Sequence, residues 1–213
     1  MALDLRRAGI ATQLVGVDLN SENARKAVEL GLVDKIENEG DAISTADLVI
    51  LAIPVNALSQ LLPSVLDSVK KKAIVIDTGS TKRMICRSIS HHAHRGQFVA
   101  SHPIAGTENS GPEAAFEGLF KGKTNIICEK EKSAEGALAL AEKIFSALEM
   151  NTIFMEPEEH DKHVAYVSHL SHVSSFLLGQ TVLDIERDEK NIFALAGTGF
   201  ASTVRLAKSS PDR

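Results

Sequence analysis

Aromatic residues are scarce in this sequence of 213 residues, since they make up 4% of it and tryptophan is absent. Proteins that bind single-stranded nucleic acid stack bases on aromatic side chains, so this composition disfavours that class. The net charge of −5 also disfavours nucleic acid or an acidic membrane as a partner held by charge. A hydrophobic content of 44% is that of an ordinary globular protein. We therefore expect no nucleic-acid partner and no membrane partner.

Cysteine is also rare, and long apolar runs are missing. The two cysteines, Cys86 and Cys128, do not have the spacing of a metal-binding pair. Cys86 falls in an expected helix and Cys128 in an expected strand, which favours two buried thiols in a reducing compartment. We find neither a signal peptide nor an apolar run of membrane-spanning length. These observations predict a soluble, cytoplasmic protein.

What the sequence does contain is an alternation of short apolar runs and helical patterns up to residue 156. Strands are expected at residues 12–18, 47–54, 73–77, 98–101, 124–128 and 152–155. The runs at 47–54 and 73–77 are almost entirely apolar, as in parallel strands that are covered on both faces. Strands that alternate with helices predict an α/β domain with a parallel, doubly wound sheet.

The pattern changes after residue 156. Residues 158–185 contain no proline and a single glycine, Gly179, and apolar residues recur there at helical spacing. A second helix is expected at residues 191–206. We therefore expect two domains, an α/β domain at residues 1–156 and an all-helical segment at residues 157–213.

The strand expected at 12–18 ends in Asp18, just before a turn. In a dinucleotide-binding fold the second strand ends in such an acid, whose carboxylate binds ribose hydroxyls and repels the extra phosphate of NADP. A Gly-x-Gly-x-x-Gly turn should precede this acid by about 20 residues. Only 17 residues precede Asp18 here, and they lack that pattern. We therefore expect the first strand and the glycine loop to precede Met1 in a longer chain. By itself, Asp18 is also typical of an ordinary turn.

The most distinctive stretch is SHPIAGTENSG at residues 101–111. It follows the apolar run 98–100, so His102 lies where a strand ends, next to the stiff ring of Pro103. Ligands bind at the carboxyl ends of strands in open α/β sheets, and histidine has an unperturbed pKa of about 6.5. Taken alone, a His-Pro pair favours a capping or loop-fixing role over a catalytic one.

Further segments place this stretch in a larger pattern. In chain order they are GVDLN (16–20), LAIPV (51–55), DTGSTK (77–82), SHPIAGTENSGPEAA (101–115), HVAYVSHLSH (163–172) and GFASTVRLAKSSPD (199–212). Together they resemble the prephenate and arogenate dehydrogenases of tyrosine biosynthesis. The resemblance implies a Rossmann-like domain, here without its first strand and glycine loop, followed by a helical dimerisation domain. It also implies an NAD(P)-dependent oxidative decarboxylation of a cyclohexadienol.

The same resemblance assigns roles to individual residues. It implies that His102 is the catalytic histidine, which accepts the proton of the C4 hydroxyl as hydride leaves C4. Ser80 would orient that hydroxyl. Arg205 would bind a substrate carboxylate through its guanidinium fork. His172 and His169 would add polar contacts to the substrate.

The cofactor expected from Asp18 is NAD, and we also expect Ile53, Pro54 and Gly79 to contact it. The sequence departs from the family in one place near Arg205, because Ala201 and Ser202 stand where relatives often have a basic residue and an aspartate.

The chain also ends at Arg213, before the further helices that build the family's dimer. We therefore expect a chain that is truncated at both ends. The resemblance implies a homodimer for full-length members and leaves open whether this chain dimerises by itself.

Other interpretations remain beside an NAD-dependent prephenate dehydrogenase. The substrate could be arogenate, or the chain could be a catalytically inactive fragment of such an enzyme. A Rossmann-type enzyme for a hydroxy acid is a third possibility, which SHPIAGTENSG disfavours. A metal site is not expected, because His163 and His172 lie on opposite faces of their predicted helix and no acid-histidine metal motif is present.

Overall fold

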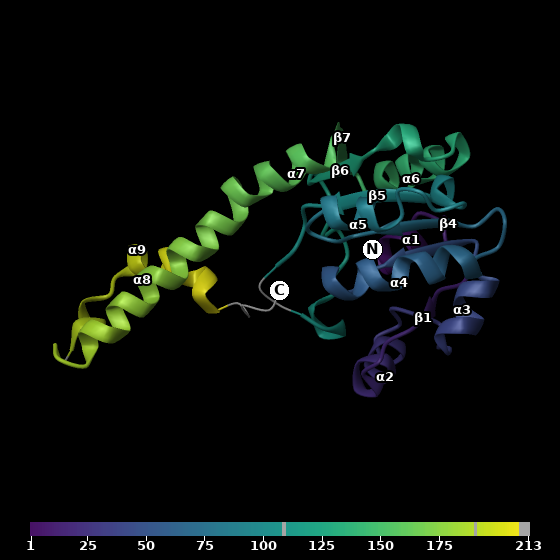
Figure 1. The fold of residues 1–213 in the computed structure, drawn as a ribbon. Coiled ribbons are helices and arrows are strands. Elements are labelled where there is room, and N and C mark those ends of the chain that lie inside the picture. The colour runs from purple at the N-terminus through teal and green to yellow at the C-terminus, as the bar shows by residue number, and fades with distance from the viewer. Residues whose placement is uncertain (108–109, 190, 209–213) are drawn as a thin grey trace. The chain divides into compact units, whose positions relative to one another are not determined.

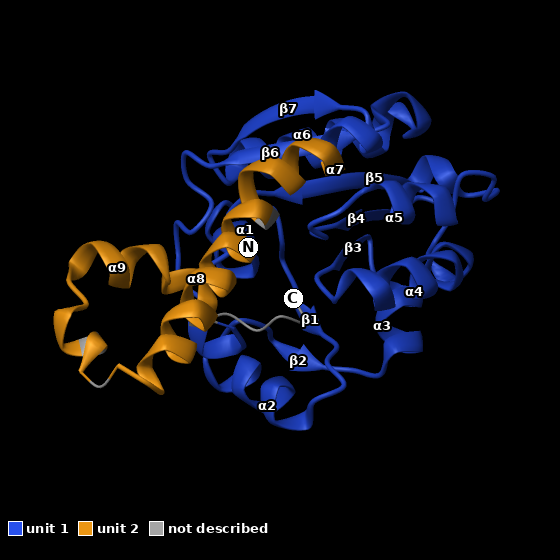
Figure 2. Cartoon of the chain, turned by 60° about the vertical axis from the view of Figure 1, so that its left-hand side comes forward, with its two compact units in different colours: residues 1–160 blue, residues 161–213 orange. Residues whose placement is uncertain are grey.

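The computed structural model describes residues 1–107, 110–189 and 191–208 (Figure 1). Backbone contacts divide the chain into two compact units, residues 1–160 and residues 161–213 (Figure 2). Unit 1 combines strands and helices. Every regular element described in unit 2 is helical.

The main sheet of unit 1 has five strands among the described residues. In their order across the sheet they are β3 (Leu48–Leu51), β4 (Ile74–Asp77), β5 (Phe98–Pro103), β6 (Thr124–Cys128) and β7 (Asn151–Met155). β3, β4 and β5 are parallel, β6 is antiparallel to β5, and β7 is parallel to β6. The sheet is therefore mixed, whereas the sequence predicted parallel strands throughout.

The direction of β6 follows from the connection that precedes it. Neighbouring parallel strands need a crossover, usually a helix, whereas a strand that returns directly to its neighbour is antiparallel. The described part of the connection between β5 and β6 contains only a 3-10 turn, Pro112–Ala114. Helix α6 (Glu135–Ala147) then supplies the crossover that makes β7 parallel to β6.

A separate two-stranded sheet lies near the start of unit 1. Its strands, β1 (Val15–Gly16) and β2 (Lys35–Ile36), are parallel and are connected through helix α2 (Ser21–Glu29). β1 is shorter than the strand that the sequence predicted, and β2 was not predicted. A Cβ at Gly16 would lie 2.9 Å from Cδ1 of Ile36, so a larger residue at this position would push the Ile36 side chain aside.

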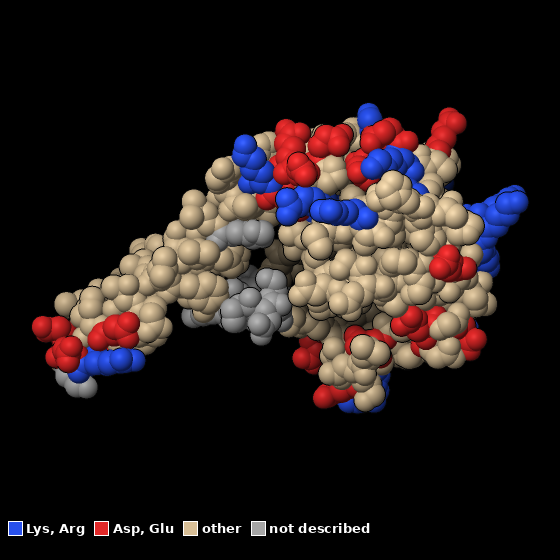
Figure 3. Space-filling model, in the orientation of Figure 1, with Lys and Arg blue, Asp and Glu red and all other residues tan. Residues whose placement is uncertain are grey.

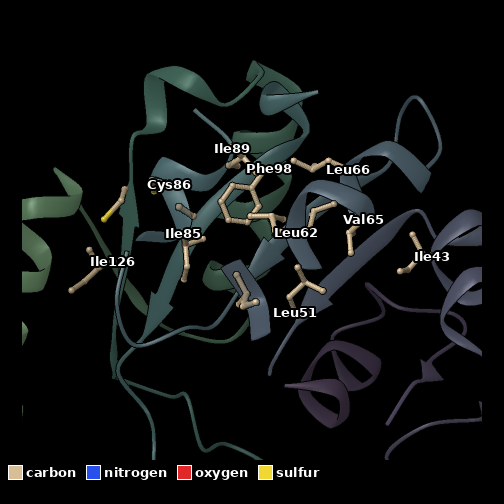
Figure 4. Close-up of a cluster of buried hydrophobic side chains, with 14 residues drawn as sticks. Ile43, Leu51, Leu62, Val65, Leu66, Ile85, Cys86, Ile89, Phe98 and Ile126 are labelled. Carbon is tan, nitrogen blue, oxygen red and sulfur yellow. The ribbon is translucent and has the colours of Figure 1, made fainter. Parts of the chain in front are cut away.

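Helices cover both faces of the main sheet, as in a doubly wound fold. Besides α2 and α6, the helices described in unit 1 are α1 (Ala2–Arg7), α3 (Glu39–Thr45), α4 (Val55–Ser68) and α5 (Arg83–Ser88). Leu62 and Leu66 of α4 and Ile85 of α5 pack with Phe98 in one buried cluster (Figure 4). This cluster fills the space between α4, α5 and the sheet.

A second buried cluster lies on the other face of the sheet. It contains Leu5 of α1 and Phe145 of α6, together with Ile76 of β4 and Val99 of β5. Phe98 and Val99 are consecutive residues and belong to opposite clusters, because successive side chains of a strand point to opposite faces. Burial on both faces explains why these strands are apolar throughout.

Unit 2 is a succession of helical segments. Helix α7 (Pro157–Val164) begins in unit 1, and after it come a π-helical turn (Ala165–His169), α8 (Leu170–Glu186), a 3-10 turn (Ile192–Leu195), α9 (Thr198–Thr203) and a 3-10 turn (Arg205–Lys208). The buried hydroxyl of Ser175 accepts a hydrogen bond from the backbone N–H of Ala207 at 3.0 Å, which fixes the last turn against α8.

The helix expected at residues 191–206 is broken into short pieces. Gly197 has an extended backbone and caps α9, so the chain changes direction there. Among the described residues, no helix combines the length and the apolar character needed to cross a membrane. On the face in Figure 3, the described acidic and basic side chains of unit 1 are interspersed and form no patch of one sign.

Candidate active site

The candidate site lies at the edge of the main sheet where β3, β4 and β5 end. Because these strands are parallel, their carboxyl ends meet at one edge. Ile53 and Pro54 follow β3, Gly79 and Ser80 follow β4, and His102 lies near the end of β5. The fold thus brings the residues predicted after these three neighbouring strands to one edge.

The turn after β4 is built around the fully buried carboxylate of Asp77. Its Oδ2 accepts hydrogen bonds from the backbone N–H of Gly79 at 3.0 Å and from Nζ of Lys82. Its Oδ1 accepts from the backbone N–H of Ser101 at 2.9 Å, and the Ser101 hydroxyl donates to the carbonyl of Asp77. One buried side chain therefore joins the turn after β4 to β5, next to His102.

Lys82 is as deeply buried as its partner, with an exposed fraction of 0% for both side chains. Buried charges of opposite sign support each other only when they are paired and hydrogen-bonded, and removing one partner leaves the other uncompensated. Sequence reasoning missed this pair, although both residues belong to the segment DTGSTK. The pair holds the ends of the turn that carries the exposed Ser80.

Gly79 is required by this arrangement. A Cβ at that position would lie 2.9 Å from Oδ2 of Asp77 and 3.0 Å from Cδ1 of Ile85. Both neighbours are buried, so neither moves away without disturbing the core. The buried Gly79 therefore fixes the shape of the turn, and its contact with a cofactor stays a prediction.

His102 is half-buried and is paired with a second histidine, His160 of α7. Nδ1 of His102 lies 2.9 Å from Nε2 of His160. The rings meet edge to face, with centroids 5.1 Å apart. His160 is fully buried. Sequence reasoning missed this pair, because 58 positions separate the two residues and only the tertiary fold brings them together.

Asp18 lies in a different environment. It is exposed, and its Oδ1 accepts a hydrogen bond from the backbone N–H of Asn20 at 2.8 Å. The side chain of Asn20 in turn caps α2, because its Oδ1 accepts from the backbone N–H of Glu22 and Asn23. Asp18 therefore serves the turn between β1 and α2 and presents its carboxylate at the surface.

The predicted substrate residues Arg205 and His172 belong to unit 2. Arg205 is exposed and begins the last 3-10 turn. His172 is half-buried, and its Nδ1 donates to the carbonyl of Ser168 at 3.0 Å. The side chain of His169 lies outside the described residues. The substrate roles of all three stay predictions.

The described residues contain no group of three or more His, Cys, Asp or Glu side chains that could hold a metal ion. Cys86 and Cys128 are both buried thiols, as the sequence predicted. Burial raises the pKa of the Cys86 thiol far above its usual value, which makes it a poor nucleophile.

Comparison with known families decides which family this fold and site belong to. Residues 1–154 match the profile of the prephenate dehydrogenase nucleotide-binding domain, and residues 156–213 match that of the prephenate dehydrogenase dimerization domain. The chain belongs to the prephenate dehydrogenase family. The resemblance inferred from the sequence motifs is thereby confirmed.

Individual members of the prephenate dehydrogenase family show how far the similarity extends. A cyclohexadienyl dehydrogenase from Zymomonas mobilis is 31% identical over 188 residues, which are 87% of this chain and 64% of that protein. A prephenate dehydrogenase from Bacillus subtilis is 29% identical over 219 residues, which cover 99% of this chain and 58% of that protein. The chain therefore spans less than two thirds of the length of these curated relatives.

Solved structures of the same family confirm the Rossmann-like fold class. A prephenate dehydrogenase from Aquifex aeolicus, in complex with hydroxyphenyl propionate and NAD+, aligns with a TM-score of 0.89 at 32% identity. That alignment covers 99% of this chain and 74% of the other. An arogenate dehydrogenase from Synechocystis aligns with a TM-score of 0.76 at 29% identity, over 99% of this chain and 75% of the other.

Proposed function

We propose that this chain carries out the NAD-dependent oxidative decarboxylation of prephenate to 4-hydroxyphenylpyruvate, a step of tyrosine biosynthesis. The observation that carries the proposal is the position of His102, which lies at the carboxyl edge of the sheet beside the turn that presents Ser80. Both family domains and the structural similarity to a prephenate dehydrogenase support the assignment.

In this proposal His102 handles the proton of the reaction. NAD+ supplies the hydride acceptor when it is bound. As hydride leaves C4 of the substrate, the C4 hydroxyl oxygen becomes a carbonyl and its proton passes to His102. The bond to the ring carboxylate then breaks, carbon dioxide leaves, and the electron pair of that bond completes the aromatic ring. The phenolate oxygen formed in this way takes the proton back from His102.

The other residues bind and orient. Ser80, on the turn held by Asp77 and Lys82, would orient the C4 hydroxyl toward His102. Arg205 would bind a substrate carboxylate, and His172 and His169 would add polar contacts.

The residues present fit NAD on one side of the site. The exposed carboxylate of Asp18 suits the ribose hydroxyls, and the partly exposed Ile53 and Pro54 suit an apolar ring face. The buried Gly79, in the turn after β4, would add a further contact to the cofactor. The sequence contains no Gly-x-Gly-x-x-Gly turn, so binding of the pyrophosphate is the step that most needs an experiment.

Three further statements belong to this proposal. The domain division lies between residues 156 and 157, close to where the two family profiles meet and to the boundary of the compact units. The enzyme is a cytoplasmic homodimer, which the match to a dimerization domain supports. Its partner is a small molecule rather than a nucleic acid or a membrane.

Two measurements test the proposed function. Calorimetry of NAD+ binding should be run on the 213-residue chain and on a version extended upstream by a strand and a glycine turn from a relative. NADH formation should then be followed with prephenate and with arogenate as separate substrates. We expect NADH only when prephenate is present.

NADH formation with arogenate but not with prephenate would mean that arogenate is the substrate. The similarity to an arogenate dehydrogenase supports this alternative. The absence of cofactor binding and turnover in both versions would contradict the proposal and favour a catalytically inactive domain.

A further inference from the structure

We propose that His160 is a positioning residue that fixes the tautomer of His102, so that Nδ1 of His102 carries the hydrogen and Nε2 of His102 accepts the substrate proton. The proposal rests on the proton-accepting role of His102 in the proposed function. It adds a residue to which the sequence had assigned no role, and it gives each ring nitrogen of His102 a definite task.

The geometry of the pair restricts the possible arrangements. With Nδ1 of His102 and Nε2 of His160 at 2.9 Å, one of these two atoms donates a hydrogen and the other accepts it. Two neutral imidazoles have two ways to do this, because each ring carries its single hydrogen on either nitrogen. Either His102 donates from Nδ1, or His160 donates from Nε2.

Only the first arrangement suits a base. If His102 donates from Nδ1, its Nε2 has a lone pair and can take a proton from a hydroxyl group. If His160 donates instead, His102 uses the lone pair of Nδ1 for that bond and carries its hydrogen on Nε2. Nε2 then has no free lone pair with which to accept the substrate proton. The direction of one hydrogen bond therefore decides whether His102 works as a base.

Burial shields Nε2 of His160, the acceptor of this hydrogen bond, from solvent. Its exposed fraction is 0%, so bulk water does not compete for the bond to His102. An unpaired charge on an imidazole at this depth would be costly. When His102 becomes positively charged during the reaction, its Nδ1–H bond to the neutral His160 ring becomes charge-assisted and shorter.

The backbone around His160 is also held in place. His160 lies in the first turn of α7, which begins at Pro157, and its backbone N–H donates to the carbonyl of Glu156 at 2.9 Å. On the other side, His102 lies in β5, where it is in register with Ile126 of β6. Both rings are thus carried by regular elements, as a site that needs a fixed hydrogen bond requires.

The decisive experiment reads the tautomer directly in the unmodified chain. Two-dimensional NMR that correlates the ring nitrogens and ring hydrogens of ¹⁵N-labelled histidine distinguishes the two tautomers, and a His102→Gln spectrum assigns the signals. We expect a protonated Nδ1 and an unprotonated Nε2 in His102. The reverse pattern in the unmodified chain would overturn the proposal, and this readout does not depend on dehydrogenase activity.

Variants then separate positioning from packing. His160→Phe keeps a ring in the buried space and removes the acceptor, whereas His160→Gln places an acceptor oxygen near the position of Nε2. We expect His102 in His160→Phe to lose its preference for a hydrogen on Nδ1. We also expect kcat to fall roughly 10- to 100-fold with KM changed less than about twofold, as for partners that orient a functional side chain. His160→Gln should recover most of the kcat.

His163→Phe is the matched control, because His163 is an exposed residue of the same helix. It should leave both the tautomer and kcat unchanged. An unchanged kcat in His160→Phe would show that His160 only fills space, and equal losses of kcat in the Phe and Gln variants would show that an acceptor at this position does not matter. Either result would overturn the positioning role. A chain without dehydrogenase activity but with the expected tautomer would contradict the proposed function and leave the hydrogen-bond assignment standing.

Discussion

The two sides of the candidate site are constructed in opposite ways. On the side of β4 and β5, a buried carboxylate, a buried ammonium and a buried histidine hold the turn with Ser80 and the ring of His102. On the side of β1, Asp18 is exposed and is held by hydrogen bonds within its own turn. A proton transfer needs atoms fixed to a fraction of an ångström, whereas binding a ribose tolerates a solvated carboxylate. The difference predicts that mutations on the first side lower the free energy of unfolding strongly and that those on the second side lower it only slightly.

The largest effect should come from breaking the buried ion pair. Lys82→Met leaves the carboxylate of Asp77 buried without its cation, which should lower the free energy of unfolding by about 3–5 kcal/mol. Urea unfolding followed by circular dichroism measures this change. Lys70→Met removes an ion pair with Asp47 that is largely exposed and should cost less than about 1 kcal/mol. Similar losses from both variants would contradict the contrast between buried and exposed pairs.

The next effect concerns the glycine in the same turn. Gly79→Ala places a Cβ against Oδ2 of Asp77 and Cδ1 of Ile85, so it should destabilise the fold by about 1–3 kcal/mol. Gly136→Ala is the control, because this exposed residue of α6 has no atom within 4 Å of the new Cβ. It should stabilise the fold by about 0.5–1 kcal/mol, since alanine favours a helix. Thermal unfolding of the two variants should therefore shift in opposite directions.

A smaller effect is expected on the other side of the site. Asn20→Ala removes the cap of α2 and should cost about 1 kcal/mol of unfolding free energy. Asn23→Ala changes the same residue type inside that helix and should cost nothing or stabilise slightly. A loss of more than about 3 kcal/mol for Asn20→Ala would mean that this side is as tightly coupled to the core as the other.

The smallest change in stability should come from Asp18→Asn. The amide oxygen still accepts the hydrogen bond from Asn20, so the free energy of unfolding should stay within about 0.5 kcal/mol. The preference for NAD+ over NADP+ should nevertheless fall by on the order of 10-fold, because the negative charge is lost. Calorimetry with both cofactors measures this ratio, with Glu22→Gln as a control for the loss of one nearby charge. An unchanged ratio would argue that Asp18 serves only its turn.

Much of the fold was predictable because it depends on local periodicity. The apolar runs that became β3, β4 and β5 are buried on both faces, and the change of pattern after residue 156 marks the helical segment. The direction of β6 was not predictable in this way. It depends on the connection that precedes this strand, whose glycine- and proline-containing sequence does not reveal the partner strand. β2 is too short to produce a pattern at all.

The site was predictable only in part, for related reasons. His102 and Ser80 were predicted as site residues because they lie in distinctive segments that end strands. Lys82 looks like a surface residue in the sequence, and only its burial beside Asp77 reveals its role. His160 lies in the expected helical segment without a motif that sets it apart. Its contact with His102 joins residues far apart in the chain, which no local pattern records.

The complete burial of Lys82 also has a kinetic consequence. Reagents that modify lysine react with the neutral amine in contact with solvent, and this amine is sealed inside the protein. Lys82 should therefore be labelled only during the brief openings of unit 1. When the reagent is in large excess, the rate of labelling at this one residue equals the opening rate, and at lower concentration it reports how often the open form occurs. The labelling rate of Lys82 thus measures how fast the sheet that carries His102 opens.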